Sequence, residues 1–282
     1  MPHEGEVAIS QFVGEDFAAH DERALKLARF PKLAHLHAGA SEDLAASAVD
    51  GALPMLRVSL RGAGGHLIVA DRNASRIELA PSKFEAYLEH EGLGAVSKER
   101  ARLGESGKPG RERYTRHLKA LVQVGSARDE TYGARAGMRL EIVPEANPVF
   151  VEPGAALPVL VLFGGAPLPG VRVEAFSRDG ADVRGASYTT DAEGRIHVAI
   201  DRRGAWLLRL VHMIRCAGCA DADWESFWGA YTFASADPSG AAVTAPPMFA
   251  PKRGGALRIG GAIAAGALLL GAAIYVRRRR RR

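Results

Sequence analysis

Apolar and polar residues alternate in short runs along most of the chain. Residues 56–60 read Leu-Arg-Val-Ser-Leu, and residues 66–70 form a short apolar run after a glycine-rich turn. Both patterns are typical of strands, the first of a strand buried on one face. Between residues 138 and 213 such runs recur about every ten residues, with Gly, Pro and Asp turns between them. This spacing predicts an antiparallel β-sandwich in that part of the chain.

Helical patterns interrupt the strands between residues 81 and 124. Pro81 suits the first turn of a helix, and Phe84 and Leu88 would lie on one apolar face of it. A second helical stretch is expected at residues 98–103. Residues 111–124 fit either a helix or a strand.

A long apolar run lies near the end of the sequence. It begins at Ile259, ends at Val276, and holds 18 residues without a charged side chain. About this length is needed for a helix to cross a bilayer, although a buried core helix is the alternative. Six arginines follow directly and could not be buried beside a core helix. They are Arg277, Arg278, Arg279, Arg280, Arg281 and Arg282.

We therefore predict a transmembrane helix at residues 255–276 and a cytoplasmic tail at residues 277–282. Basic residues that flank a membrane helix stay on the cytoplasmic side, so the preceding chain is expected in the periplasm or outside the cell. A glycine-containing spacer, an apolar helix and an arginine cluster also resemble bacterial C-terminal sorting signals, some of which are cleaved.

The basic tail explains the net charge. The chain has 37 basic and 32 acidic residues, a net charge of +5. Without the six terminal arginines, 31 basic residues remain against 32 acidic ones, a net charge of −1. A nucleic-acid-binding protein needs a basic surface on its body, so we expect no nucleic-acid partner.

The combined patterns predict a mainly β protein with two immunoglobulin-like or transthyretin-like β-sandwich domains and inserted short helices. Residues 167–173 and 190–195 resemble the transthyretin-like or carboxypeptidase-regulatory type of sandwich. The domain boundaries follow the composition. They are 1–137 with a helical insert at about 81–124, 138–234 for the second sandwich, and 235–254 for a flexible linker before the membrane helix.

The two cysteines, Cys216 and Cys219, are spaced C-x-x-C. In an oxidising compartment this spacing favours a disulfide that closes a small loop. A redox-active pair and a zinc site are the alternatives, but the first needs a helix start and the second needs two more ligands.

His212 is the candidate metal ligand. It ends an apolar strand and precedes a group of soft and hard ligands, namely Cys216, Cys219, Asp221 and Asp223. The alternative is a hydrogen-bonded core histidine.

His35 and His37 would share one face of a strand, but no third ligand is evident near them, so we interpret them as solvated. The sequence has neither a G-x-S-x-G nor an H-E-x-x-H motif. We expect no enzymatic activity.

Several blocks resemble one family of bacterial exported proteins, the domain-of-unknown-function family 4198. Its members have been labelled NikM-like, periplasmic components of cobalt or nickel transport. The blocks are residues 81–93, 105–114, 119–125, 140–148, 191–200, 211–213 and 223–228. The resemblance implies Ni²⁺ or Co²⁺ as ligand and a metal transporter subunit as partner.

The N-terminus departs from that family pattern. Members begin with a signal peptide and a short mature segment that starts with histidine, whereas residues 1–6 offer no export signal. We expect a start codon further upstream; the alternative is a tail-anchored protein that faces the cytoplasm. The function expected is extracytoplasmic binding, of a divalent transition metal for uptake. The alternative is a non-enzymatic surface module that binds protein or glycan.

Overall fold

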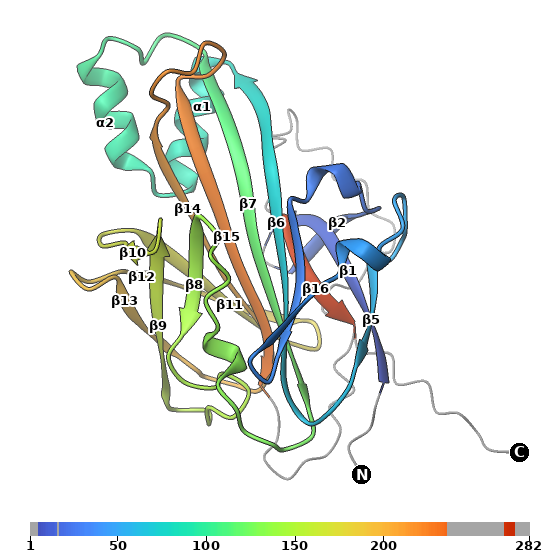
Figure 1. Ribbon diagram of the computed structural model, residues 1–282. Coiled ribbons are helices and arrows are strands. Elements are labelled where there is room, and N and C mark those ends of the chain that lie inside the picture. The colour runs from blue at the N-terminus through green and yellow to red at the C-terminus, as the bar shows by residue number, and fades with distance from the viewer. Residues whose placement is uncertain (1–4, 16, 236–267, 274–282) are drawn as a thin grey trace, which may run out of the picture.

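The computed structural model describes residues 5–15, 17–235 and 268–273. They form a mainly β protein whose central layer is a long, twisted sheet (Figure 1). The described strands form one eight-stranded sheet and two four-stranded sheets.

The eight-stranded sheet contains strands from both halves of the described chain. Only β15 and β7 pair in parallel; its other neighbours are antiparallel. In spatial order the strands are β12 (Asp182–Thr189), β11 (Arg172–Asp179), β14 (Gly204–Arg215), β15 (Trp224–Ser235), β7 (Gly110–Val124), β6 (Gly64–Leu79), β3 (Lys32–His37) and β4 (Ala40–Asp43).

The two smaller sheets cover opposite faces of this layer. One contains β1 (Gly5–Glu15), β2 (Ala18–Arg23), β5 (Leu56–Leu60) and β16 (Leu268–Ala273). The other contains β8 (Leu140–Pro144), β9 (Ala156–Phe163), β10 (Ala166–Pro167) and β13 (Arg195–Ala199).

Alternation along β6 shows how both faces are buried. Ile68 and Ala70 pack in the apolar core that holds β1 and β5, whereas Leu67 and Val69 pack in the core that holds β8, β9 and β13. Side chains alternate across a strand, so a strand covered on both sides reads as a continuous apolar run. This explains the apolar sequence of residues 67–70.

Two helices connect β6 to β7 along the chain and lie at one end of the long sheet (Figure 1). Helix α1 (Pro81–His90) has Pro in its first turn and buries Phe84, Tyr87 and Leu88, as its pattern predicts. Helix α2 (Gly94–Arg102) begins earlier than expected, and residues 111–124 belong to strand β7. Single 3₁₀ turns occur at η1 (Leu27–Arg29), η2 (Ala45–Ser47) and η3 (Thr131–Gly133).

The mainly β class is confirmed. The strands of residues 1–137 and those of residues 138–234, expected to form separate sandwiches, meet in the eight-stranded sheet through β7 and β15. The boundary itself stays a prediction.

No helix among the described residues has both the length and the apolar character needed to span a membrane.

Of the predicted membrane segment, the structure describes only Leu268–Ala273. These residues form β16, antiparallel to β1, so the predicted helix is not their conformation here. Because β16 lies at the edge of its sheet, pairing with β1 satisfies only those backbone N–H and C=O groups that face β1. The remaining residues of the segment, the rest of the linker and the arginine tail lie outside the described residues.

A buried ion pair fastens the connection between β7 and β8. Lys119 Nζ lies 2.6 Å from Glu141 Oε2, and the side chains are 1% and 4% exposed. The Glu141 carboxylate also accepts hydrogen bonds from the backbone N–H groups of Ala136, Gly137 and Met138. Burial lowers the pKa of Lys119, and the Glu141 charge opposes that shift. The pair thereby holds residues 136–141 against the centre of the long sheet.

Replacing Lys119 by Met keeps the volume but leaves the Glu141 charge buried without its cation. We expect Lys119→Met to lower the free energy of unfolding by about 3–5 kcal/mol in chemical denaturation. Arg203→Ala removes an exposed pair with Glu152 and serves as the control, with an expected loss below about 1 kcal/mol. Equal losses in both variants would contradict the structural role of the buried pair.

Candidate functional site

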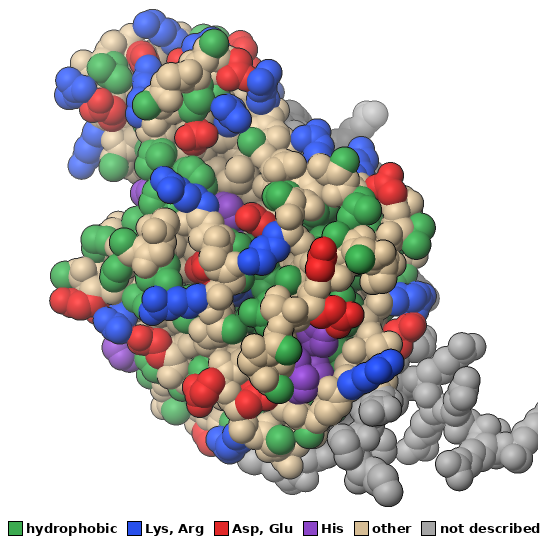
Figure 2. Space-filling model, in the orientation of Figure 1, with side chains coloured by type: hydrophobic (Ala, Val, Ile, Leu, Met, Phe, Trp, Pro, Cys, Tyr) green, Lys and Arg blue, Asp and Glu red, His purple; other side chains and the backbone are tan. Residues whose placement is uncertain are grey.

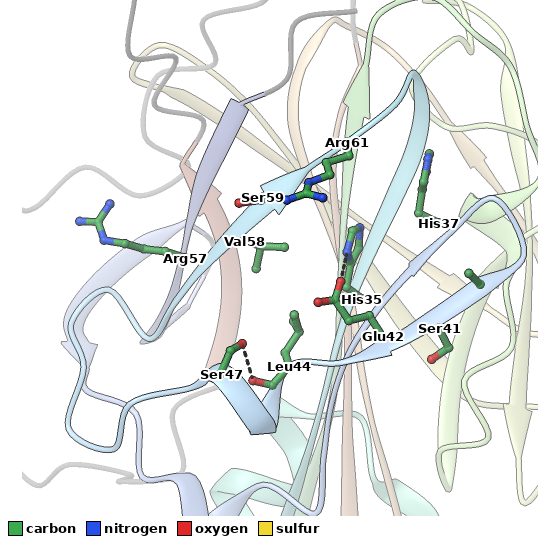
Figure 3. A pocket seen from close by; sticks show the side chains of 11 residues that line it. His35, His37, Ser41, Glu42, Leu44, Ser47, Arg57, Val58, Ser59 and Arg61 are labelled. Atoms are coloured by element: carbon green, nitrogen blue, oxygen red, sulfur yellow. Dashed lines mark hydrogen bonds and ion pairs between the residues drawn. The ribbon is translucent and has the colours of Figure 1, made fainter. Parts of the chain in front are cut away.

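A pocket of about 550 Å³ opens where the edge of the eight-stranded sheet meets β5 of the neighbouring sheet. The β3–β4 hairpin supplies one wall and β5 supplies the other (Figure 3). Its lining is mostly polar. The residues are His35, His37, Ala40, Ser41, Glu42, Leu44, Ser47, Arg57, Val58, Ser59 and Arg61.

Three histidines stack at this pocket. His35 and His37 lie two residues apart on β3 and so share a face, and His66 on β6 is the register partner of His37. The rings of His37 and His66 are nearly parallel, with centroids 3.9 Å apart. His35 Nε2 lies 2.9 Å from His66 Nδ1. In the space-filling view, histidine side chains reach the surface beside acidic and basic groups (Figure 2).

Backbone carbonyls determine which ring nitrogens carry hydrogen. His66 Nε2 lies 3.3 Å from the Gly62 carbonyl oxygen, and His37 Nδ1 lies 2.8 Å from that of Gly65. A carbonyl oxygen only accepts, so both nitrogens must donate. His66 Nδ1 is then an acceptor for the N–H of His35 Nε2.

In the neutral state, lone pairs therefore remain on His35 Nδ1 and His37 Nε2. His35 Nδ1 lies 3.6 Å from the carboxylate of Glu42, and the two side chains point toward each other (Figure 3). Glu42 is 69% exposed, whereas His35 is only 7% exposed. The pocket thus presents one buried nitrogen, one half-buried nitrogen and one solvent-facing carboxylate.

Burial keeps two of these imidazoles neutral. Burial, with a smaller contribution from the neighbouring His37 and His35 rings, lowers the pKa of His66 to about 4. Burial also lowers the pKa of His35, against the opposing effect of Glu42. Neutral imidazole is the form that binds metal ions.

Two of these groups have the spacing of ligands to one transition-metal ion, although among the described residues no three ligand atoms of this pocket converge. A separation of 3.6 Å between His35 Nδ1 and Glu42 Oε2 suits two ligands of one ion at about 2.0–2.2 Å each. The ring centroids of His35 and His37 are 6.3 Å apart, so His37 must turn to join as a third ligand. The carbonyl and histidine contacts supply the outer hydrogen bonds that metal-ligating histidines require.

The metal ligand predicted from the sequence lies elsewhere. His212 is half-buried on β14, with its ring 4.6 Å from that of Phe163, and burial lowers its pKa. Within the described part of the chain it joins no group of three converging ligand atoms. Asp221 and Asp223 pair instead with Arg76 and Arg111. The role of His212 as a metal ligand stays a prediction.

The structure joins Cys216 and Cys219 in a disulfide, with Cα atoms 5.6 Å apart.

A hydroxyl–imidazole–carboxylate chain occurs on the long sheet, although the sequence suggested no such set. Thr115 Oγ1 lies 3.1 Å from His117 Nε2, and His117 Nδ1 lies 2.7 Å from Asp71 Oδ1. His117 is 4% exposed and its ring stacks on that of Phe227. A side chain this deeply covered has little access to a substrate, and its Nδ1 contact with Asp71 lacks hydrogen-bond geometry, so the three residues resemble a buried polar contact of the core. The expectation of no enzymatic activity stays a prediction.

A buried carboxyl group lies beneath helix α1. Glu112 accepts hydrogen bonds from Tyr87 Oη, at 3.2 Å, and from the Ser226 hydroxyl, and Trp228 Nε1 donates to that same hydroxyl. Burial raises the pKa of Glu112 to about 7, against the lowering effect of these donors. Glu112 thus links α1, β7 and β15 through a carboxyl group that is half protonated near neutral pH.

Fold and site together define a three-layered β protein with a histidine- and carboxylate-lined pocket at a sheet edge. The family model described as "Domain of unknown function (DUF4198)" matches residues 1–214, and the chain belongs to that family. No curated protein and no solved structure matches the chain.

The sequence pointed to only part of the pocket. The H-x-H spacing of His35 and His37 is visible in the sequence, but His66 and Glu42 join them only through the pairing of β3 with β6 and β4. A useful signal was present. His66 opens an apolar strand directly after a glycine turn, the position expected of a neighbouring hairpin strand.

The lowered histidine pKa values make stability depend on pH. Between pH 6.5 and about 4 the unfolded chain binds a proton at His66 that the folded chain resists, so the free energy of unfolding falls as pH falls through this window. The slope due to His66 is at most about 1.4 kcal/mol per pH unit. In pH-dependent denaturation, the free energy of unfolding of His66→Gln should fall less steeply with decreasing pH than that of the wild type. An unchanged slope would contradict this assignment.

Glu112 should make stability depend on pH in the opposite direction from His66. Its pKa is higher in the folded state than in the unfolded state, so its stabilising effect is complete below pH 4.5 and is lost as pH rises through about 7. Glu112→Gln lacks this titration. Between pH 4.5 and pH 8, the free energy of unfolding of the variant should rise by on the order of 2–3 kcal/mol relative to that of the wild type in the same denaturation measurements. A pH-independent difference between the two proteins would rule this out.

Proposed function

We propose that the protein is an extracytoplasmic, non-enzymatic binding protein for a divalent transition-metal ion such as Ni²⁺ or Co²⁺. The observation that carries this proposal is the meeting of His35 Nδ1 and the Glu42 carboxylate, 3.6 Å apart, beside the stacked ring of His37. Imidazole suits Ni²⁺, Cu²⁺ and Zn²⁺, and a carboxylate adds the charge that a divalent ion needs.

The pocket geometry also supports reversible binding. Glu42 is exposed and one face of the pocket is open to solvent, so an ion reaches the ligands without unfolding of the sheet. Arg57 lines the same pocket but pairs with Glu6 and points away from the histidines (Figure 3). Its positive charge is therefore partly neutralised at the site where a cation would bind.

Membrane attachment is part of the proposal. The apolar run of residues 259–276 and the six arginines that follow support an anchor in the cell membrane, with the body in the periplasm or exterior. Insertion requires Leu268–Ala273 to exchange their pairing with β1 for helical hydrogen bonds. The resemblance to NikM-like proteins supports a metal transporter subunit as partner.

The two-layer packing of β8, β9 and β13 on the long sheet supports an immunoglobulin-like or transthyretin-like sandwich in residues 138–234.

The second candidate function is a surface module that binds protein or glycan. The polar character of the pocket favours it, because Ser41, Ser47, Ser59 and Arg61 offer hydroxyl and guanidinium groups to a polar ligand.

Calorimetric titration with Ni²⁺, Co²⁺ and Cu²⁺ tests the metal proposal. We expect one ion per chain, and His35→Ala should weaken binding by roughly a hundredfold because it removes the buried ligand. His37→Ala should also weaken it. His197→Ala is the matched control, since His197 is exposed on β13 and far in sequence from the pocket strands.

The variants also separate the two histidine sites. Loss of binding in His212→Ala with full binding in His35→Ala would move the metal site to His212. Equal affinity in wild type and in both variants would remove the metal function, and the glycan or protein ligand would become the leading candidate.

A further inference from the structure

The hairpin loop between β14 and β15 has a base that does not depend on its disulfide. The Cys216 N–H donates to the Asp223 carbonyl at 2.9 Å, and the Asp223 N–H donates to the Arg111 carbonyl at 2.8 Å. The Arg111 guanidinium also donates two hydrogen bonds to the Asp223 carboxylate, at 2.7 and 2.9 Å. These bonds position the two ends of the loop on the neighbouring strand β7.

Two sulfur atoms and a carboxylate converge at this loop. The Sγ atoms of Cys216 and Cys219 and a carboxylate oxygen of Glu225 all lie within 4.8 Å of one another. Cys216 is buried, and Cys219 and Glu225 are half-buried. Glu225 is the first residue after Trp224 on β15, so the sheet fixes its backbone beside the loop.

A positively charged side chain, that of Arg113, lies against the sulfur of Cys219. Arg113 Nη1 is 3.6 Å from Cys219 Sγ, and the Cα atoms of Arg113 and Glu225 are register partners on β7 and β15. A guanidinium in this place stabilises negative charge on sulfur. It also balances the negative charge that two thiolates and one carboxylate bring together.

We propose that the reduced chain binds a thiophilic divalent ion of the Zn²⁺ class at Cys216, Cys219 and Glu225. Two thiolates and a carboxylate supply three ligands of a tetrahedral site, and water supplies the fourth. The charges of the ion, the three anionic ligands and Arg113 sum to zero, so the half-buried site carries no net charge. It shares no residue with the histidine pocket and goes beyond the proposed function.

The disulfide closes this site, and reduction opens it. A dithiol reductant breaks the bond between the sulfurs of Cys216 and Cys219, gives them two electrons and two protons, and itself becomes a disulfide. The ion then displaces the two thiol protons as it binds. In the oxidised chain neither sulfur has the thiolate charge that the ion needs.

Co²⁺ is a suitable probe because thiolate ligation gives it an intense sulfur-to-metal absorption band that histidine and carboxylate ligands do not give. The full chain is titrated with Co²⁺ after reduction by a phosphine, which brings no thiolate of its own, and again without reduction. We expect the band at one ion per reduced chain, displacement of Co²⁺ by Zn²⁺, and no band in the oxidised chain. Cys219→Ser should abolish the band, and Glu225→Gln should keep it but weaken binding by roughly ten- to a hundredfold.

Two controls keep this test separate from the histidine pocket. Ala217→Ser alters an exposed position in the same loop and should bind Co²⁺ as wild type does. His35→Ala removes the pocket ligand and should leave the band unchanged. A reduced wild type with no band would overturn the site, as would a band that persists in Cys219→Ser. Unchanged affinity in Glu225→Gln would overturn the assignment of Glu225.

Discussion

The parallel pairing of β7 with β15 is the contact on which the rest of the structure depends. It runs over nine register pairs, from Glu112 with Trp224 to Ala120 with Thr232. Parallel neighbours need a crossover connection, and here the crossover contains β8 to β14 and therefore one whole small sheet. The central layer is complete only after these two distant segments meet, so the pairing fixes both halves of the chain at once.

This central position explains why polar residues on β7 have such specific partners. A polar or charged group buried in the middle layer costs several kcal/mol unless it is paired. Glu112 is paired with Tyr87 and Ser226, and Lys119 is paired with Glu141. Each pairing also connects β7 to a different element, so that the charges position α1 and the β7–β8 connection as well as satisfying one another.

Local patterns predicted local structure well. The Pro81 helix and the alternating strand at residues 56–60 follow from spacing within a few residues, and both are present. Residues 111–124 were ambiguous because β7 is covered on both faces, and a doubly buried strand loses the alternation that identifies it.

The candidate sites also contain features that local sequence predicts and features that depend on strand pairing. The disulfide pairing of Cys216 with Cys219 is local and was predictable, whereas the approach of Arg113 to Cys219 depends on the β7–β15 register. His35 and His66 are 31 residues apart and meet only because β3 and β6 pair. Single-sequence patterns hold no information about which strands become neighbours, so the pocket could be predicted only in part.

The two proposed sites would respond to different features of the surroundings. The histidine pocket needs neutral rings, so acid would release an ion from it while leaving the cysteine loop oxidised and closed. The disulfide must accept two electrons before the cysteine loop offers thiolate ligands, so in an oxidising exterior the loop would bind no ion at any pH. Ligand softness separates them further, because imidazole and carboxylate accept Ni²⁺ and Co²⁺ readily, whereas thiolates favour Zn²⁺ and softer ions. One chain could then bind borderline ions under oxidising conditions and thiophilic ions only after reduction, with one set of ligands on β3 and β4 and the other on β15 and the loop before it.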